Sequence, residues 1–212
     1  MQNRIAILIP EATYHVFNRA NGKERLFFSE ENYHYFLKKY ASLISPVADT
    51  FCYCLMPNHF HFIIRVKTAA ELQCSNLSGF QTLTGLSEEK LSTLLSRQFS
   101  HLFNGYAQAI NKQETRKGSL FMRPFKRKRI TDDKYLKNLV HYIHFNPKEA
   151  GLVAKLEDWK FSSFNAISDP TGLKNLSGLA IKKEEVIEWF EDLENFMDFH
   201  KVQSRSIDSE YL

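Results

Sequence analysis

The sequence has few cysteines, no phosphate-binding loop and no long apolar run, and each of these absences excludes a class of protein. Its three cysteines are an odd number without zinc-site spacing, which fits a reducing, intracellular setting. No segment of the form G-x-x-x-x-G-K-S/T occurs, so we expect no P-loop chemistry and no ATP-dependent step. No apolar run approaches membrane-spanning length, and residues 1–10 lack the long apolar region of a signal peptide. We therefore expect a cytoplasmic protein without membrane contact.

Length and composition predict a single core of ordinary size. The chain has 212 residues, of which 43% are apolar and 14% are aromatic. Eighteen Phe against four Met indicate a core built largely from aromatic rings. The net charge of +4 is weak support for a nucleic-acid partner when it is taken over the whole chain.

The distribution of positive charge is more informative than its total. Lysines and arginines gather before residue 130, where they are interleaved with Phe121 and Phe125. This basic band consists of Arg116, Lys117, Arg123, Lys126, Arg127, Lys128 and Arg129. Such a mixture suits phosphate contacts and base stacking on DNA, although a solvated charged strand would have the same composition.

A pair of histidines stands at the start of a predicted strand. Met56-Pro57-Asn58 reads as a turn, and His59-Phe60-His61 leads from it into an apolar run. Alternate side chains of a strand share a face, so His59 and His61 project together. Two neutral imidazoles on one face offer half of a divalent metal site, whereas the plainer interpretation is two polar residues on a strand.

A helix is predicted over residues 134–145, some 80 residues beyond the histidine pair. We expect Thr131 to cap it and Asp132 and Asp133 to lie in its first turn, where the helix dipole favours negative charge. Pro147 disfavours helical geometry in the residue before it, so the helix should end near Asn146. Tyr142 and Asn146 are four residues apart and share the face at the helix end.

The order of elements predicts an α+β fold. Hydrophobic periodicity predicts strands over residues 12–18, 50–55, 59–66 and 124–130, and helices over 29–43 and 87–111, the first of them capped by Ser29. This β-α-β-β-α-β order is the ferredoxin-like (RRM-like) arrangement, an antiparallel sheet with helices on one face. The helix over residues 134–145 then follows the sheet as the last helix of the core.

Several ordered motifs resemble those of the single-tyrosine HUH transposases of bacterial insertion sequences, and most closely the REP-associated tyrosine transposases. The resemblance covers about residues 12–165. The motifs are Tyr14-His15-Val16-Phe17-Asn18-Arg19, Leu55-Met56-Pro57-Asn58-His59-Phe60-His61, Gly118-Ser119-Leu120-Phe121, Tyr142-Ile143-His144-Phe145-Asn146-Pro147, Ala150-Gly151-Leu152-Val153 and Trp159-Lys160-Phe161-Ser162-Ser163.

The resemblance implies cleavage and rejoining of single-stranded DNA beside hairpins, through a 5′-phosphotyrosine intermediate. Tyr142 would be the nucleophile, brought by its helix to the open sheet face. His59, His61 and the side-chain oxygen of Asn146 would bind Mg²⁺ or Mn²⁺, with Mn²⁺ the easier ion for imidazole ligands. The implied partners are single-stranded DNA hairpins, bound by a monomer or a homodimer.

Other assignments of these residues stay open at this point. Tyr135 lies on nearly the same helix face as Tyr142 and is a second candidate nucleophile, and Tyr106 lies in another helix. We expect His141 and His144 to be exposed or helix-end residues. His15, on the first strand, could approach the site, although we expect it to be a surface residue of that strand. A hairpin-binding protein with dormant chemistry and an unrelated metal hydrolase are the alternative functions, the latter requiring acidic ligands near the histidine pair.

Residues 166–212 lie beyond the resemblance and are interpreted as an extension of a domain that spans residues 1–165. A single amphipathic helix is predicted over residues 182–200, with one apolar side and one acidic side. We expect it to dock on the core. An acidic helix that binds a partner, or that mimics DNA and covers the basic band, is the alternative.

Overall fold

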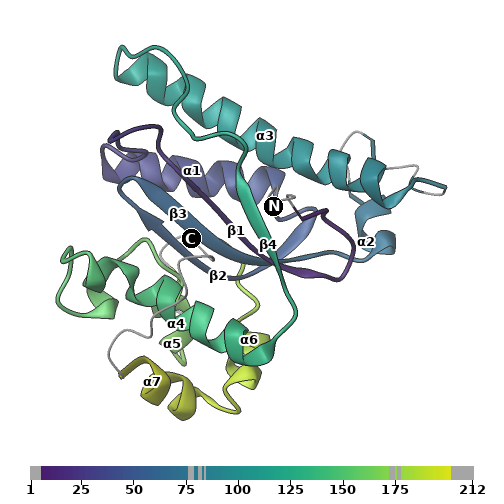
Figure 1. Cartoon of the computed structure of the whole chain (residues 1–212). Coiled ribbons are helices and arrows are strands. Elements are labelled where there is room, and N and C mark those ends of the chain that lie inside the picture. The colour runs from purple at the N-terminus through teal and green to yellow at the C-terminus, as the bar shows by residue number, and fades with distance from the viewer. Residues whose placement is uncertain are drawn as a thin grey trace, which may run out of the picture.

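Four antiparallel strands form one sheet in the order β2-β3-β1-β4. The computed structural model describes residues 6–75, 79, 80, 83, 85–171, 175 and 178–201. In chain order its elements, shown in Figure 1, are β1 Thr13–Arg19, α1 Glu30–Leu43, β2 Ala48–Met56, β3 His59–Val66, α2 Ala69–Gln73, α3 Glu88–Gln113, β4 Lys126–Ile130, α4 Asp133–Glu149, the 3₁₀ turn η1 Leu156–Asp158, α5 Phe164–Ser168, α6 Lys183–Trp189 and α7 Leu193–Lys201. The ferredoxin-like α+β prediction is confirmed, because β1 and β3 lie at the centre of the sheet with β2 and β4 at its edges.

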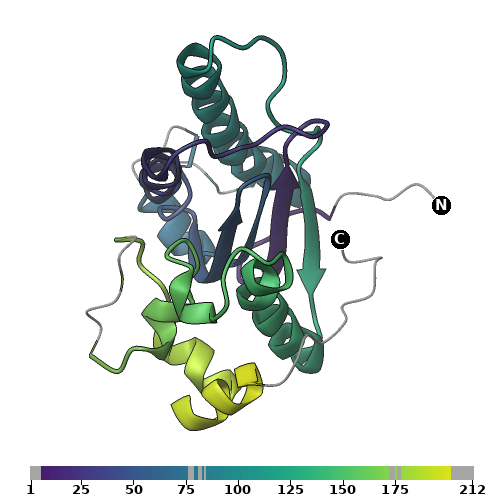
Figure 2. The same cartoon turned by 90° about the vertical axis from the view of Figure 1, so that its left-hand side faces the viewer.

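The alternation of side chains divides the sheet into two faces with separate apolar cores. Tyr14, Val16 and Phe62 point to one face and pack against α1 and α3. Cys52 and Ile63 point to the other face, where they pack against α4 and the helices that follow it. Figure 1 shows α1 and α3 on one side of the sheet and α4 to α7 on the other, and Figure 2 shows the same separation after a quarter turn.

The second face is therefore less open than the sequence predicts. Helix α4 contacts β2, β3 and β4, and α6 contacts β2. These helices cover the face because α4 and α6 bury apolar side chains of their own, including Leu139, Ile143 and Val186.

Helix α4 differs from its prediction at both ends. Its N-cap is Asp132 rather than Thr131, and the Asp132 carboxylate accepts a hydrogen bond from the Tyr135 amide. The helix does not end near Asn146 but continues through Pro147 to Glu149. Pro147 removes only one backbone donor, while the carbonyls of Asn146 and Pro147 accept from residues 150 and 152, so the last turn is retained.

The predicted single helix over residues 182–200 is two helices. Glu191 adopts a φ of 77° between α6 and α7, and this left-handed residue breaks the helical path. Asp192 then caps α7, because its side chain accepts from the Asn195 amide. The break lets Phe190 and Phe196 enter the second core at a ring-centroid distance of 5.2 Å. Both helices dock on the core as expected, and residues 202–212 of the predicted extension lie outside the described residues.

Candidate functional site

Strand β3 and helix α4 bring the histidine pair and the predicted helix residues to one place. The His59 and His61 rings lie 5.1 Å apart, centroid to centroid, on one sheet face. The His59 Nε2 atom is 3.3 Å from the Asn146 side-chain oxygen, and the Tyr142 ring meets the His61 ring edge-on at 5.5 Å. Four side chains from segments more than 80 residues apart therefore surround one point, within a single chain.

Asn58 determines which nitrogen of His59 faces the site. The His59 Nδ1 atom lies 2.7 Å from the Asn58 side-chain oxygen, and its Nε2 atom lies 3.3 Å from the Asn146 oxygen. Both oxygens can only accept, so we assign the single proton of the neutral ring to Nδ1, which makes the shorter contact. The lone pair of His59 is then on Nε2 and faces the Asn146 oxygen. The Asn146 amide nitrogen donates to the Tyr142 carbonyl at 3.2 Å, which fixes that orientation of the side chain. Two acceptors thus face each other at 3.3 Å, and a cation between them would remove their repulsion.

His15 contacts the site, which the sequence allowed but did not favour. It was expected at the surface but is fully buried on β1, between β3 and β4 in the sheet and against the stacked Phe17 ring. Its Nε2 atom lies 2.9 Å from His61 Nδ1. When His61 donates from Nδ1 to His15, its Nε2 lone pair points into the site. The ferredoxin-like order places β1 beside β3, so the same-face histidine on β1 was a usable signal.

The donor set fits a divalent metal ion. The His61 Nε2 atom is buried and has no hydrogen-bond partner among the described residues. Burial lowers the pKa of both His59 and His61, so both rings are neutral and can bind a cation through Nε2. Two ligand atoms that bind one ion at right angles, each at about 2.1 Å from it, lie about 3 Å from each other. The separation of His59 Nε2 and Asn146 Oδ1, 3.3 Å, is close to this value.

Tyr142 is half-buried, and its hydroxyl needs activation to react. Burial raises the pKa of Tyr142 above its usual value of 10, while a hydrogen bond from the Asn146 side chain opposes that rise. A cation next to Asn146 would lie close enough to stabilise the phenolate.

The other two candidate tyrosines are placed differently. Tyr106 is fully buried on the opposite side of the sheet, where its hydroxyl donates to the Leu26 carbonyl, so it cannot reach a substrate. Tyr135 lies two turns before Tyr142 on α4, and burial raises its pKa to about 12. The Tyr135 ring is covered by the Lys128 ammonium at 5.5 Å rather than placed against the histidines.

The basic band does not form one surface. Lys126 and Lys128 are paired with Phe17 and His15 of β1, so both lie on the face that carries the histidines. Arg127 and Arg129 lie on the opposite face, where the Arg127 side chain donates to the Ala6 carbonyl and stacks on Phe125.

The remaining members of the band lie next to α3. Arg116 forms an ion pair with Glu24 and a hydrogen bond with Asn111, both of which hold the loop after α3 in place. The exposed Arg123 donates to the Asn104 side chain at 3.3 Å, and Lys117 is exposed in the loop.

His141 and His144 are buried rather than exposed, because α7 covers their side of α4. His144 lies at the centre of a polar network: its Nδ1 atom is 3.0 Å from His200 Nε2 of α7, and its Nε2 atom is 2.8 Å from the Ser163 hydroxyl. Ser163 in turn accepts from the Tyr53 amide of β2. The network therefore joins the C-terminal helix, the Tyr142-bearing helix and the sheet.

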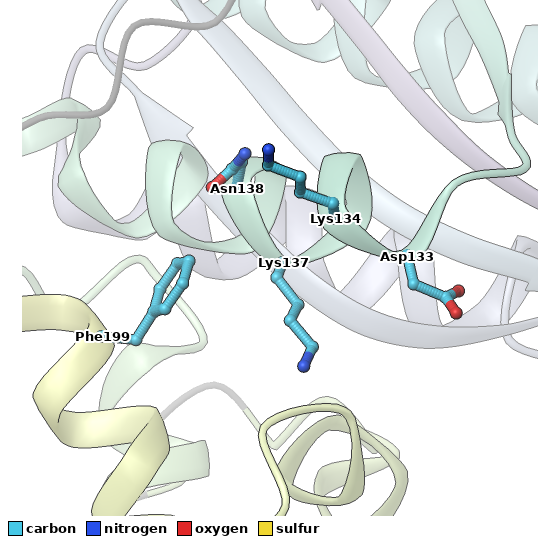
Figure 3. Close-up of a pocket in the computed structure, with 5 residues that line it drawn as sticks. All are labelled: Asp133, Lys134, Lys137, Asn138 and Phe199. Atoms are coloured by element: carbon cyan, nitrogen blue, oxygen red, sulfur yellow. The ribbon is translucent and has the colours of Figure 1, made fainter.

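A pocket of about 250 Å³ opens between α4 and α7, away from the histidine pair. Figure 3 shows Phe199 reaching from α7 toward α4, with Lys134 and Lys137 pointing in different directions from the helix. Asp133 and Asn138 complete its lining, and none of the predicted site residues takes part. We therefore do not place the chemistry there.

Among the described residues, no group of three His, Cys, Asp or Glu side chains could hold a metal ion, so the acidic ligands that a metal hydrolase would need are absent from this part of the chain. No helix within the described ranges is both long and apolar enough to cross a bilayer.

Known proteins resemble this chain in sequence and in structure. No family model matches it. It is 26% identical over 117 residues to a Haemophilus influenzae protein assigned as a REP-associated tyrosine transposase, a match that covers 55% of this chain and 59% of that protein, less than two thirds of its length. A solved REP-associated tyrosine transposase bound to a REP hairpin superposes with a TM-score of 0.54 at 16% identity, over 77% of this chain and 83% of that chain. The chain thus resembles the REP-associated tyrosine transposases in sequence and shares their fold, as its ordered motifs predict.

Proposed function

We propose that this protein is a metal-dependent single-stranded DNA transposase, which cleaves and rejoins DNA beside hairpins through a 5′-phosphotyrosine intermediate. The observation that carries the proposal is the meeting of His59, His61, Tyr142 and Asn146 at one point. The similarity to REP-associated tyrosine transposases supports the substrate class.

Tyr142 would act as the nucleophile. Its hydroxyl oxygen attacks a backbone phosphorus, a tyrosine–phosphorus bond forms, and the bond from phosphorus to the 3′-oxygen breaks. The leaving 3′-oxygen takes up a proton and departs as a 3′-hydroxyl. A 3′-hydroxyl later attacks the phosphotyrosine and restores both the phosphodiester and the tyrosine. The number of phosphodiester-type bonds is conserved, so the cycle needs no ATP.

His59, His61 and Asn146 would hold Mg²⁺ or Mn²⁺ with two Nε2 atoms and one amide oxygen. When bound, the ion would polarise the scissile phosphate and stabilise charge that develops during attack. Two imidazole ligands suit Mn²⁺ better than Mg²⁺, which prefers oxygen. Asn58 and His15 hold the two rings with Nε2 directed to the site.

Hairpin DNA is the substrate that we propose, with cleavage in the single strand next to the stem. The solved relative was bound to a REP hairpin. Lys126 and Lys128 lie on the face that carries the histidines, so they are placed to contact phosphates leading to Tyr142. Tyr142 contacts His61 of its own chain, which supports catalysis within one subunit, whether the protein is a monomer or a homodimer. We place this activity in the cytoplasm.

The first experiment is a denaturing-gel assay for a covalent complex. Purified protein, Mn²⁺ and labelled single-stranded hairpins from the DNA that flanks its gene would be combined. We expect a denaturant-resistant adduct for the unaltered protein, and none for Tyr142→Phe, because only the nucleophilic oxygen is removed. Tyr142→Phe should still bind the hairpin in a native gel.

Tyr135→Phe is the matched control, because it removes a hydroxyl two turns away on the same helix. It should retain the adduct. An adduct that persists in Tyr142→Phe and disappears in Tyr135→Phe would reassign the nucleophile. Hairpin binding without any adduct, in Mn²⁺ and in Mg²⁺, would favour a DNA-binding protein with dormant chemistry.

A further inference from the structure

Phe17 is a partly exposed aromatic residue immediately beside the candidate site. It lies on β1 directly opposite His61 of β3 and Lys126 of β4, on the same sheet face as both. Its ring belongs to neither of the two apolar cores. A packing role therefore accounts poorly for a phenylalanine at this position.

The Phe17 ring is the outer member of an ordered stack. It lies 4.4 Å from the His15 ring with 21° between the planes, and 5.8 Å from the His61 ring with 23° between the planes. His15 is fully buried, so it supports Phe17 from within the fold. The stack presents a flat ring, held at a fixed angle, next to the residues that would bind the scissile phosphate.

Two cations accompany this ring. The Lys126 ammonium lies over Phe17 at 5.5 Å from the ring centroid. Arg19 is exposed two residues along β1 on the same face, and it pairs in register with His59. Aromatic rings with adjacent lysine and arginine side chains form the usual platform for single-stranded nucleic acid, because every base has a stacking face and every nucleotide has a phosphate.

We propose that Phe17, Arg19 and Lys126 form a nucleobase subsite, in which the base next to the scissile phosphate stacks on Phe17. Lys126 neutralises a neighbouring phosphate, and the planar Arg19 guanidinium covers the other face of the base. The subsite orients the strand so that its phosphate lies between Tyr142 and the histidines. This inference rests on the proposed function, because it assumes a single-stranded DNA substrate.

The test places the fluorescent base 2-aminopurine at successive positions around the cleavage point of a flanking-DNA hairpin. Binding is measured in the Tyr142→Phe background, so that no DNA is cleaved. We expect the fluorescence of 2-aminopurine to be quenched on binding at one of these positions. The quenching should disappear with Phe17→Leu, because leucine keeps the apolar bulk but has no aromatic face. Phe17→Trp should retain it. Affinity for the intact hairpin should fall roughly tenfold in Phe17→Leu.

An abasic nucleotide at the quenched position separates stacking from stability. The Tyr142→Phe protein should bind this abasic DNA with the same affinity whether or not it also carries Phe17→Leu, because no base remains to stack. Phe28→Leu, at an exposed phenylalanine outside the site, is the matched control and should change nothing. If Phe17→Leu does not fold, the Tyr142→Phe protein alone still tests the subsite. Binding of the abasic hairpin roughly tenfold weaker than binding of the intact hairpin supports the subsite, and equal binding of the two hairpins overturns it.

Failure of this inference differs from failure of the proposed function. Normal adduct formation with no quenching that depends on Phe17 would overturn the subsite alone. Absence of both hairpin binding and adduct in the unaltered protein would overturn the proposed function, and the subsite with it.

Discussion

At the scale of single residues, the orientation of two imidazole rings decides whether the site can bind a metal. Each ring has one nitrogen directed at the site and the other held by a neighbour: Asn58 for His59 and His15 for His61. Such neighbours fix the tautomer and direction of a ligand before the metal arrives. His15 is therefore a positioning residue for His61.

Replacement of His15 should weaken metal binding without removing a ligand. We expect His15→Val to lower Mn²⁺ affinity about 10- to 100-fold, because His61 loses the partner of its Nδ1 atom. Calorimetric titration of the DNA-free protein with Mn²⁺ measures this directly. His15→Asn, which offers a hydrogen-bonding group in a similar place, should recover part of the affinity. Unchanged Mn²⁺ affinity in His15→Val would show that His61 needs no such support.

At the scale of elements, helix α4 is held in place by contacts on the side that faces away from the candidate site. Tyr142 and Asn146 face the sheet histidines, whereas His144 contacts His200 of α7 and Ser163 before α5. Helix α4 is thus held between β2 and α7. The network keeps the histidines neutral in a closed environment, since burial lowers the pKa of His200 to about 3 and that of His144 well below its usual range.

These buried histidines should make the protein sensitive to acid. The folded pKa values lie below the unfolded value of about 6.5, so the unfolded chain binds more protons once the pH falls below it. The free energy of unfolding should be highest above about pH 6.5 and fall toward pH 3, by up to about 1.4 kcal/mol per pH unit for each such group. Urea unfolding at about pH 7.5 and about pH 5.5 measures the slope.

Two variants assign this slope to the network. His200→Gln should reduce the pH dependence, because one buried titrating group is lost. His101→Gln, at an exposed position on α3, should leave it unchanged. Equal slopes in all three proteins would mean that the buried histidines do not control acid stability.

At the scale of the whole molecule, the sheet separates charges that are adjacent in the sequence. Lys126 and Lys128 share the face of the histidines, while Arg127 and Arg129 lie on the face of α1 and α3. Only Lys126 and Lys128 would contact a DNA strand that reaches Tyr142 along the sheet. Under the proposed function, density of charge in the sequence is therefore a poor guide to which cations would contact DNA.

Lys126 and Lys128 should contribute more to the salt dependence of DNA binding than two cations on other surfaces, Lys117 and Arg129. Changing Lys126 and Lys128 to Gln should flatten the slope of log affinity against log salt by about 1.4, or about 0.7 for each lost phosphate contact on a single strand. The double change of Lys117 and Arg129 to Gln removes the same charge elsewhere and should have a smaller effect. Equal slopes for the two double variants would show that the site face is not the path of the strand.

Much of the fold follows from local patterns in the sequence. The bounds of β3 agree with the prediction, and Ser29 is the N-cap of α1 as expected. The C-terminal helices were less predictable, because the left-handed conformation of Glu191 is imposed by packing rather than by a glycine. Likewise, α4 passes through Pro147 because burial of Phe145, Asn146 and Pro147 outweighs the loss of one hydrogen bond.

The sequence by itself determined the strands, the main helices and the ferredoxin-like order of the core, because periodicity is a local property. Its short motifs, through their resemblance to a known family, predicted the four residues of the candidate site. Only the tertiary structure decided that His15 supports His61, that Phe17 stands beside the site and that His144 is buried against His200. Each of these contacts joins residues separated by 44 positions or more, or depends on which face of a strand meets which neighbour. Strand register and helix packing set such contacts, and no single segment of the chain contains that information.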